Sequence, residues 1–571
     1  MYRSEHPKPQ FQRDFWVNLN GEWQFEQDHG NSGEARKLYE DGVAYSAKIN
    51  VPFCPQSRLS GIGDVDFMSS VWYKRSVTLT EEQVSGKVFL HFGAVDYLAT
   101  VYVNGKHCGS HKGGYVSFKI DISDCVHAGE NTICLHAEDN ERDPMIPTGK
   151  QSGGYYSSGC HYTRTTGIWQ TVWLEFVPTV HIEKVKYFTD VEAGTLTVVA
   201  DLCGKGTFGV AASFEGKDCG NASVSSDGGQ AVLTLKLTEK HLWRLGKGGL
   251  YDLKLTYGDD VVHSYFGLRS ISYRDFKFFL NGESVFQRLV LDQGFNPEGI
   301  YTAPSDAELE ADVDRSMAMG FNGARLHEKV FEERFLYHAD RKGYLVWGEY
   351  PNWGIDHSRP EAVYAILPEW LEEIERDFNH PSIVGWCPFN ETWDCDGRRQ
   401  HNPLLAIVYH ATKAADPTRP CIDTSGNFHV VTDIYDIHDY DQNPVTVAEK
   451  YDKLNDGTYR DLFHDRQNYD YKLPFFVSEY GGIRWSDKDG WGYGDAPKTE
   501  EEFLSRLKGL TDAFLDNPKI FAFCYTQLTD VEQEQNGLYT YERKAKFPPE
   551  VIHPIFARKA KVDESSEPEN R

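Results

Sequence analysis

The sequence predicts a multidomain protein of β and α/β class, in which a jelly-roll β-sandwich and an immunoglobulin-like β-sandwich precede a (β/α)8 TIM barrel. Its 571 residues are too many for one hydrophobic core, so about three domains are expected. Short alternating segments separated by turns fill the first half of the chain, without a long helical pattern. From residue 273 to residue 560, strand-like and helix-like segments alternate, which is the rhythm of a (β/α)8 barrel.

Residues 1–178 are predicted to form the jelly-roll domain. Alternating segments such as 71–77 and 100–103 recur at short intervals, and the second runs into the hairpin turn Asn104-Gly105. Short strands at this spacing are typical of a closed sandwich. Residues 144–158 are polar and rich in glycine, and this loop is long enough to reach the cleft of another domain.

The remaining boundaries follow from changes in periodicity. Residues 179–272 alternate again and have the size of an immunoglobulin-like sandwich, without the Cys-Trp-Cys pattern of antibody domains. Residues 273–560 contain the capping box Ser305-Asp306-Ala307-Glu308 at the start of a helical stripe. We count eight barrel strands here and expect a short fifth crossover without a clear helix. Residues 561–571 are charged and are predicted to form a disordered tail.

Composition excludes several classes of partner. The net charge of −27, with no basic stripe to offset it, argues against a nucleic-acid partner. No stretch approaches the roughly 20 apolar residues of a membrane span, so we expect no membrane partner. The first residues lack the apolar core of a signal peptide, and the 11 cysteines show no CxxC spacing. We therefore expect free thiols and a cytoplasmic location.

Two apolar runs end in a glutamate. Residues 383–389 end in Asn390-Glu391, with Trp386 and Trp393 nearby in sequence, and residues 475–478 end in Glu479. A carboxylic acid packed against indole rings is poorly solvated, which raises its pKa and suits a general acid near neutral pH. A single glutamate after a strand is more often a solvated charge, but two such residues favour a hydrolase with paired carboxylates.

The barrel prediction places these glutamates in a ring of polar residues. Active sites of such barrels lie at the carboxyl ends of the strands. Taken singly, Arg325 or His438 would more often be a structural hydrogen-bonding residue. The candidate catalytic and substrate-binding residues at the predicted strand ends are Asp292, Arg325, His327, Glu349, Asn390, Glu391, His438, Tyr440, Glu479 and Gln527.

With these motifs the chain resembles glycoside hydrolase family 2, the β-galactosidase and β-glucuronidase family, over nearly its whole length. The first domain carries Val103-Asn104-Gly105-Lys106, and the barrel carries Asn390-Glu391 and Ser478-Glu479-Tyr480-Gly481 on the fourth and seventh strands. The resemblance implies a retaining exo-β-glycosidase with Glu479 as nucleophile and Glu391 as acid/base. It also implies that the first domain, residues 1–178, binds sugar, that Tyr440 contacts the nucleophile and that Asn390 holds the sugar 2-hydroxyl. It implies no required cofactor, although some members bind Mg²⁺ or Na⁺. We assign no metal ligand and expect a homo-oligomer.

One departure from the family pattern bears on the sugar. Glucuronidases of this family carry an Asn-x-Lys motif before a Gly-Ile/Leu-aromatic-Thr stretch, and its lysine pairs with the substrate carboxylate. Here residues 537–540 follow Glu534-Gln535-Asn536, so asparagine replaces the lysine. Arg325 is the only cation that the sequence places in the pocket. A uronate substrate would therefore lie close to pocket carboxylates, and such a like-charge contact at about 4 Å costs roughly 4 kcal/mol at an effective dielectric near 20. We therefore expect β-D-galactosides to be the leading substrates.

Three alternatives stay open at this point. A β-glucuronidase and a β-mannosidase, or another specificity of family 2, would use the same pair of carboxylates. A non-catalytic carbohydrate-binding protein with a vestigial barrel would need one of the two carboxylates to be lost or displaced, and both Glu391 and Glu479 are present.

Overall fold

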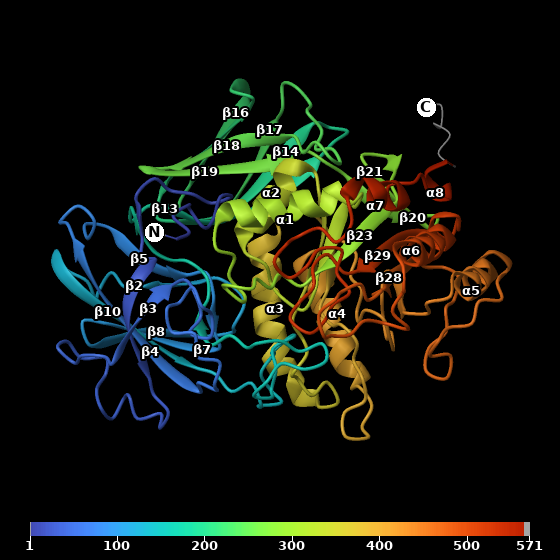
Figure 1. The fold of residues 1–571 in the computed structure, drawn as a ribbon. Coiled ribbons are helices and arrows are strands. Elements are labelled where there is room, and N and C mark those ends of the chain that lie inside the picture. The colour runs from blue at the N-terminus through green and yellow to red at the C-terminus, as the bar shows by residue number, and fades with distance from the viewer. Residues whose placement is uncertain (1, 565–571) are drawn as a thin grey trace.

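The computed structural model describes residues 2–564, which form two β-sandwiches and a barrel arranged around one another (Figure 1). The N-terminal sandwich is drawn in blue, the second sandwich in green, and the barrel in yellow to red. Each has its own cluster of buried hydrophobic side chains. The predicted fold class is confirmed.

The N-terminal sandwich packs a four-stranded sheet, β1-β12-β5-β9, against a six-stranded sheet, β3-β2-β4-β10-β7-β8. Alternation along β2 explains the packing, because Trp23 and Phe25 are buried while Glu22 and Gln24 are exposed. The predicted turn Asn104-Gly105 joins β7 to β8, with both residues at positive φ. The strands of this domain are β1 (Trp16–Asn18), β2 (Gly21–Gln27), β3 (Ala47–Val51), β4 (Ser70–Leu79), β5 (Lys87–Phe92), β6 (Val95–Asp96), β7 (Leu98–Val103), β8 (Lys106–Lys112), β9 (Phe118–Asp121), β10 (Gly129–Glu138), β11 (Gly167–Ile168) and β12 (Val172–Val177).

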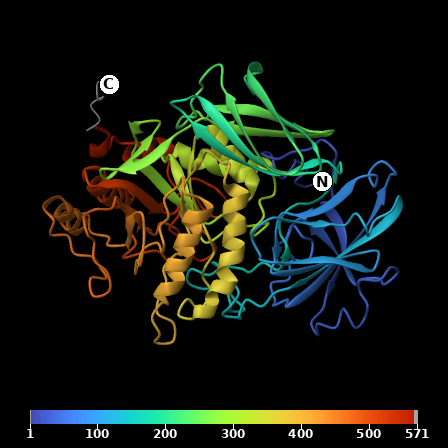
Figure 2. The same ribbon diagram turned by 180° about the vertical axis from the view of Figure 1, so that it is seen from behind.

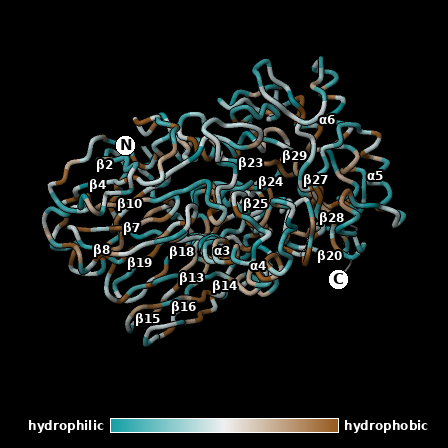
Figure 3. The backbone as a smooth tube through the Cα atoms, turned by 90° about the horizontal axis from the view of Figure 1, so that it is seen from below, coloured by the Kyte–Doolittle hydropathy of each residue, from teal (hydrophilic) through white to brown (hydrophobic). Residues whose placement is uncertain are grey.

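The second sandwich packs the sheet β13-β14-β17 against the sheet β16-β15-β18-β19, and the small sheet β20-β21-β22 follows it. Short hydrophilic and hydrophobic stretches alternate along the strands of both sandwiches (Figure 3). Such alternation is expected where one face of a sheet is buried. The strands are β13 (His181–Asp190), β14 (Thr195–Cys203), β15 (Gly206–Phe214), β16 (Lys217–Ser226), β17 (Gly229–Lys236), β18 (Leu250–Tyr257), β19 (Asp260–Gly267), β20 (Ile271–Arg274), β21 (Lys277–Leu280) and β22 (Glu283–Ser284).

The barrel contains seven regular parallel strands in the order β26-β25-β24-β23-β29-β28-β27. The strands are β23 (Gln287–Asp292), β24 (Gly323–Leu326), β25 (Leu345–Glu349), β26 (Ile383–Cys387), β27 (Tyr435–Asp439), β28 (Phe475–Gly481) and β29 (Ile520–Thr526). The helices are α1 (Asp306–Ala318), α2 (Glu333–Lys342), η1 (Pro360–Ala362), α3 (Val363–Asp377), α4 (Asn402–Ala415), α5 (Pro444–Asp456), α6 (Glu500–Leu515), α7 (Pro549–Phe556) and α8 (Lys561–Glu564). The long helices α3 and α4 lie side by side on the outside of the barrel (Figure 2).

The expected fifth strand is irregular. Residues 421–425 pair with the end of β26 only through isolated parallel bridges, Trp386 with Cys421 and Asn390 with Ser425. One carboxylate oxygen of Asp423, Oδ2, accepts hydrogen bonds from the backbone amides of Val430 and Val431 in the next segment. The segment between this position and β27 contains no helix, so the expected short fifth crossover is confirmed within the described residues.

Two local predictions for the barrel domain, the helix start at Ser305 and the disordered tail from residue 561, have different outcomes. The N-cap Ser305 accepts a hydrogen bond from the amide of Glu308, as the capping box predicts. The prediction of disorder from residue 561 is wrong for residues 561–564, which form α8, because Val562 is buried with the barrel core. The rest of that predicted tail, residues 565–571, lies outside the described residues. Among residues 2–564, no helix is both long and apolar enough to cross a membrane.

Candidate active site

The two strand-end glutamates meet at the carboxyl ends of the barrel strands. Glu479 lies within β28, and Glu391 follows β26 in a turn where its φ of 44° is in the left-handed region. This turn directs the Glu391 side chain inward, where one oxygen of Glu391, one oxygen of Glu479 and one ring nitrogen of His438 all lie within 4.8 Å of one another. The site is therefore built around a compact triad.

His438 bridges the two carboxylates. Its Nδ1 lies 2.6 Å from Oε1 of Glu391 and 3.3 Å from Oε2 of Glu479. On the other side, Nε2 lies 3.1 Å from Oγ of Ser425, whose own proton is donated to Asp436. The carboxylates beside Nδ1 can only accept, so Nδ1 carries a proton. Nε2 can donate to the Ser425 oxygen or accept from Nη1 of Arg325, which lies 3.4 Å away. Burial lowers the pKa of His438, but the charges of Glu479 and Glu391 raise it above its ordinary value.

The expectation of a raised pKa at Glu391 is wrong. Burial would raise it, but the hydrogen bond and charge of His438, the charge of Lys150 and a hydrogen bond of 3.0 Å from the Trp393 indole lower the pKa of Glu391 to about 2. The indole nitrogen of Trp386 donates to Asp416 and not to Glu391. A donated N–H favours the ionised carboxylate, whereas the expectation assumed contact with an apolar ring face.

Arg325 binds the carboxylate of Glu479, the candidate nucleophile. Its side chain is almost fully buried and donates to Oε1 of Glu479 at 3.1 Å, to Glu349 at 2.9 Å and to Asn390 at 3.1 Å. Glu349 is also buried and lies 2.9 Å from Nδ1 of His327. Glu349 thus contacts both Arg325 and His327, and Nδ1 of His327 lies 3.9 Å from Oε1 of Glu479.

Tyr440 fixes the other oxygen of Glu479. Its hydroxyl donates to Oε2 of Glu479 at 2.6 Å and lies 2.9 Å from Oγ1 of Thr526. The Tyr440 ring stacks on Tyr493, with ring centroids 3.4 Å apart. Both oxygens of Glu479 are thus held, one by Arg325 and one by Tyr440.

Two other predicted residues lie farther from the triad. Gln527 donates to Asn536 at 2.8 Å and belongs to a buried network in which Asn536 donates to Glu534 at 3.1 Å. Asp292 accepts from the amide of Gly294, and burial raises its pKa to about 6. Within residues 2–564 no hydrogen bond or ion pair joins Asp292 to Glu391 or Glu479.

The strand-end prediction missed Lys150, which comes from the N-terminal domain. Its loop is anchored to the barrel by the amides of Thr148 and Gly149, which donate to the carbonyl of Trp353 at 2.7 and 3.1 Å. The Lys150 ammonium lies 3.9 Å from the centroid of the Trp353 ring and is almost fully buried.

Electrostatic contacts make Lys150 part of the pocket. Burial lowers the pKa of Lys150, but Cys160, Glu534, Glu391 and Glu479 raise it above its ordinary value. The expectation that Arg325 is the only cation here is therefore wrong. The polar, glycine-rich stretch 144–158 was the signal in the sequence, because it predicted a loop that reaches another domain's cleft.

The triad does not fit Mg²⁺ or Na⁺, which some members of the resembling family bind. These ions take oxygen ligands. Here Nδ1 of His438 donates its proton to Glu391. An N–H group therefore already occupies the position between the two carboxylates where an ion would bind.

Comparisons with known proteins agree with this architecture. The model for the family 2 sugar-binding domain of glycosyl hydrolases matches residues 16–176, and the model for the family 2 TIM barrel domain matches residues 324–490. A β-galactosidase of Thermoanaerobacter pseudethanolicus is 28% identical over 350 residues, which cover 58% of this chain and 46% of that protein. A β-glucuronidase of Mus musculus is 27% identical over 444 residues, which cover 70% of this chain and 67% of that protein.

The chain spans about half the length of the bacterial β-galactosidase. Among solved structures, the apo β-glucuronidase of Ruminococcus gnavus has a TM-score of 0.79 and 19% sequence identity, and the match covers 97% of this chain and 100% of that one. This likeness shows a shared fold. The two family models establish that the chain belongs to glycoside hydrolase family 2.

Proposed function

We propose that this protein is a retaining exo-β-glycosidase that hydrolyses terminal β-linked sugars by double displacement. The observation that carries this proposal is the separation of the two carboxylates, because one oxygen of Glu391 and one of Glu479 lie within 4.8 Å. Retaining enzymes hold their carboxyl groups about 5–5.5 Å apart, whereas inverting enzymes need about 6.5–9.5 Å to admit a water molecule. The short separation supports direct attack of a carboxylate on the sugar.

The contacts of each glutamate support its assigned role. Glu479 is the nucleophile, since Arg325 and Tyr440 each hold one of its oxygens and fix its direction of attack. Glu391 protonates the leaving oxygen as the covalent glycosyl-enzyme forms. Glu391 then removes a proton from water, which releases the sugar with its β configuration restored.

The low pKa of Glu391 is compatible with an acid role because the triad shares a proton. The raised pKa of His438 favours its imidazolium form, in which Nδ1 carries a proton beside Oε1 of Glu391. Moving that proton across the 2.6 Å to Oε1 of Glu391 gives a carboxylic acid and a neutral imidazole, with no change in net charge. His438 thus holds the proton that Glu391 delivers to the leaving oxygen.

Paired variants test the two roles. Glu479→Gln should abolish turnover of every substrate. Glu391→Ala should spare the first step for substrates with good leaving groups, because those need little protonation. Azide added to Glu391→Ala should then speed release and give a β-glycosyl azide. An α-glycosyl azide, or full activity of either variant, would contradict these roles.

Charge does not single out one sugar. β-D-galactosides were expected because a uronate would meet uncompensated carboxylates. However, Glu391, Glu479 and Glu349 are balanced by Arg325, His438 and Lys150, and burial raises the pKa of Glu534. Because Lys150 makes no ion pair within 4 Å among the described residues, it is available to a substrate carboxylate. It therefore favours β-D-glucuronides as a second candidate beside β-D-galactosides.

The ratio of kcat/KM for nitrophenyl β-galactoside and nitrophenyl β-glucuronide decides between these candidates. A preference for the galactoside supports the original expectation from Asn536. A preference for the glucuronide supports a pairing of Lys150 with the substrate carboxylate. In family glucuronidases the lysine of the Asn-x-Lys motif has that role. If the enzyme cleaves neither substrate but cleaves a nitrophenyl β-mannoside, both candidate specificities are rejected in favour of another family 2 specificity.

A further inference from the structure

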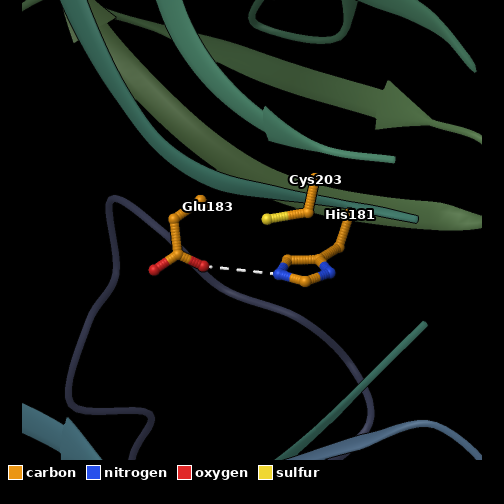
Figure 4. A group of neighbouring side chains, drawn as sticks. All are labelled: His181, Glu183 and Cys203. Atoms are coloured by element: carbon orange, nitrogen blue, oxygen red, sulfur yellow. Dashed lines mark hydrogen bonds and ion pairs between the residues drawn. The ribbon is translucent and has the colours of Figure 1, made fainter. Parts of the chain in front are cut away.

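A second cluster of donor atoms lies far from the barrel pocket, where the two β-sandwiches meet. It consists of His181, Glu183 and Cys203, whose nearest donor atoms all lie within 4.8 Å of one another. Figure 4 shows the imidazole, the carboxylate and the thiol directed toward one shared space. We propose that His181, Glu183 and Cys203 form a binding site for a divalent metal ion of the Zn²⁺ class.

The strand register explains why these three side chains share one face. His181 and Cys203 are direct partners in the antiparallel pair of β13 and β14. The register shifts between Ile182 and Lys184, so Glu183 is the extra residue of a β-bulge. A bulge redirects a side chain, and cross-strand partners stand about 5 Å apart, so the pairing brings all three donors together.

The Nδ1 atom of His181 is held by the backbone, as it is in many metal-bound histidines. It lies 2.9 Å from the carbonyl oxygen of Pro178, and a carbonyl can only accept, so Nδ1 carries a proton. Nε2 lies 3.3 Å from Oε2 of Glu183, which can only accept, so without a metal this contact needs a proton on Nε2. A bound ion would replace that proton between the two atoms. A backbone carbonyl that holds the outer nitrogen is the usual support of a metal-bound histidine.

The separation of His181 and Glu183 leaves room for an ion between them. A hydrogen bond between a charged histidine and a carboxylate is typically about 2.7–2.9 Å long, shorter than the 3.3 Å found here. Two ligands with bonds of about 2.1 Å at a tetrahedral angle lie roughly 3.4 Å apart, which matches that spacing. An ion pair would also leave the sulfur of Cys203 without a role.

The donor set selects the ion. A thiolate, an imidazole and a carboxylate together suit Zn²⁺ or Co²⁺ rather than Mg²⁺ or Ca²⁺, which prefer oxygen ligands alone. Lys119 of β9 holds Oε1 of Glu183 at 2.6 Å, which leaves Oε2 for the metal. Three protein ligands leave a fourth position for water, and the half-buried Glu183 provides the approach from solvent.

The site would tie the start of the second sandwich to the first. His181 packs edge-on against Phe89 of β5, with ring centroids 5.9 Å apart, and Lys119 also belongs to the N-terminal domain. Burial and Glu183 raise the pKa of the Cys203 thiol, so metal binding releases a proton from it and is stronger at higher pH. A bound ion stabilises the folded chain at this junction.

Cobalt binding tests the proposal with a signal that only a thiolate ligand gives. Chelator-treated protein titrated with Co²⁺ should bind one ion per chain with a thiolate-to-cobalt charge-transfer band, and Zn²⁺ should displace it. Cys203→Ser should remove the band, and His181→Gln should weaken binding at least about tenfold. Cys395→Ser, a matched control at another partly buried cysteine, should keep the band.

Two further readouts keep the test decisive. Glu479→Gln should keep the band, which excludes the barrel triad as its source, because that triad contains no cysteine. Zn²⁺ should raise the Tm of the wild type but not that of Cys203→Ser, and circular dichroism verifies that the variant folds. Absence of the band at saturating Co²⁺, or a band that survives Cys203→Ser, would overturn the proposal.

Discussion

At the scale of single residues, the position of one proton decides how the pocket works. His438 donates to Glu391 at 2.6 Å, and this contact joins residues that are far apart in sequence. The strand-end rule could predict that Glu391, Glu479, Arg325 and His438 gather at one end of the barrel. It could not predict the protonation of Glu391, because that depends on an imidazolium whose direction only the folded chain defines.

The shared proton gives a testable pH dependence. His438 has a raised pKa, so the triad keeps its proton to higher pH than a lone glutamic acid would. In His438→Gln the proton must reside on Glu391, and the basic limb of the kcat/KM profile should move to lower pH for substrates with poor leaving groups. Dinitrophenyl glycosides need little protonation, so their basic limb should move much less. An unchanged basic limb with poor leaving groups would refute the role of His438.

Lys150 permits a second prediction at this scale. If its ammonium pairs with a sugar carboxylate, Lys150→Met should lower kcat/KM for a β-glucuronide far more than for a β-galactoside. Losing one attraction of about 4 kcal/mol corresponds to roughly a thousandfold at most. Comparing both substrates in wild type and variant isolates the charge effect, since loss of packing on Trp353 affects both sugars equally. Equal losses on the two substrates would show that Lys150 does not pair with the sugar carboxylate.

At the scale of elements, the loop that carries Lys150 depends on a glycine. Gly149 has a φ of +53°, and a Cβ there would lie 2.4 Å from the carbonyl oxygen of Glu328. Gly149→Ala should therefore push the loop away from the barrel and reduce activity by about tenfold or more, because small displacements in an active site cost up to about a hundredfold. Steady-state kinetics on a folded sample measures the effect.

A matched variant separates steric clash from backbone strain. Gly159 has a similar φ of +58°, but a Cβ there would meet no atom within 4 Å. Gly159→Ala carries the same conformational strain, of roughly 1 kcal/mol, without the clash. It should keep nearly full activity, and equal losses in the two variants would mean that the contact with Glu328 is unimportant.

The regular elements were predictable because their signals are local. The capping box at Ser305 and the turn Asn104-Gly105 depend on neighbouring residues only, and both formed as expected. The irregular fifth position, residues 421–425, was not predictable in detail. Its shape depends on carboxylate contacts of Asp423 with amides seven and eight residues away, and hydrophobic periodicity carries no information about these.

At the scale of the whole molecule, a buried arginine near the N-terminus links both sandwiches. Arg13 pairs with Asp260 of β19 at 2.8 Å and with Glu175 of β12 at 3.1 Å. Removing one partner of a buried ion pair typically costs about 3–5 kcal/mol, so Arg13→Met should lower the Tm clearly. Arg58→Met, which removes an arginine that is 74% exposed and paired with the exposed Glu298, should change it little. Thermal unfolding of both variants measures the difference.

The same contact predicts how acid affects stability. Burial alone would raise the pKa of Glu175, but Arg13 and His91 hold it well below its ordinary value. A carboxyl with a lowered pKa contributes stability above its unfolded pKa and loses that contribution as pH falls through the folded value. The Tm difference between wild type and Arg13→Met should therefore narrow on acidification. A difference that stays constant down to the lowest pH at which the protein folds would contradict this account.

Assembly of the whole chain into a homo-oligomer stays a prediction, and light scattering at several protein concentrations measures it. A concentration-independent monomer mass would contradict it. The kinetic roles proposed for Glu391 and Glu479 require no second subunit, because both side chains come from one barrel.

The covalent intermediate tests the central claim most directly. A 2-deoxy-2-fluoro glycoside with a good leaving group, of whichever sugar the enzyme cleaves, should inactivate it because the second step becomes slow. Peptide mass spectrometry after inactivation should then find one fluoro-sugar attached to Glu479, and the label should be absent in Glu479→Gln. A label on another carboxylate, or rapid release of the α-anomer without any label, would contradict double displacement at Glu479.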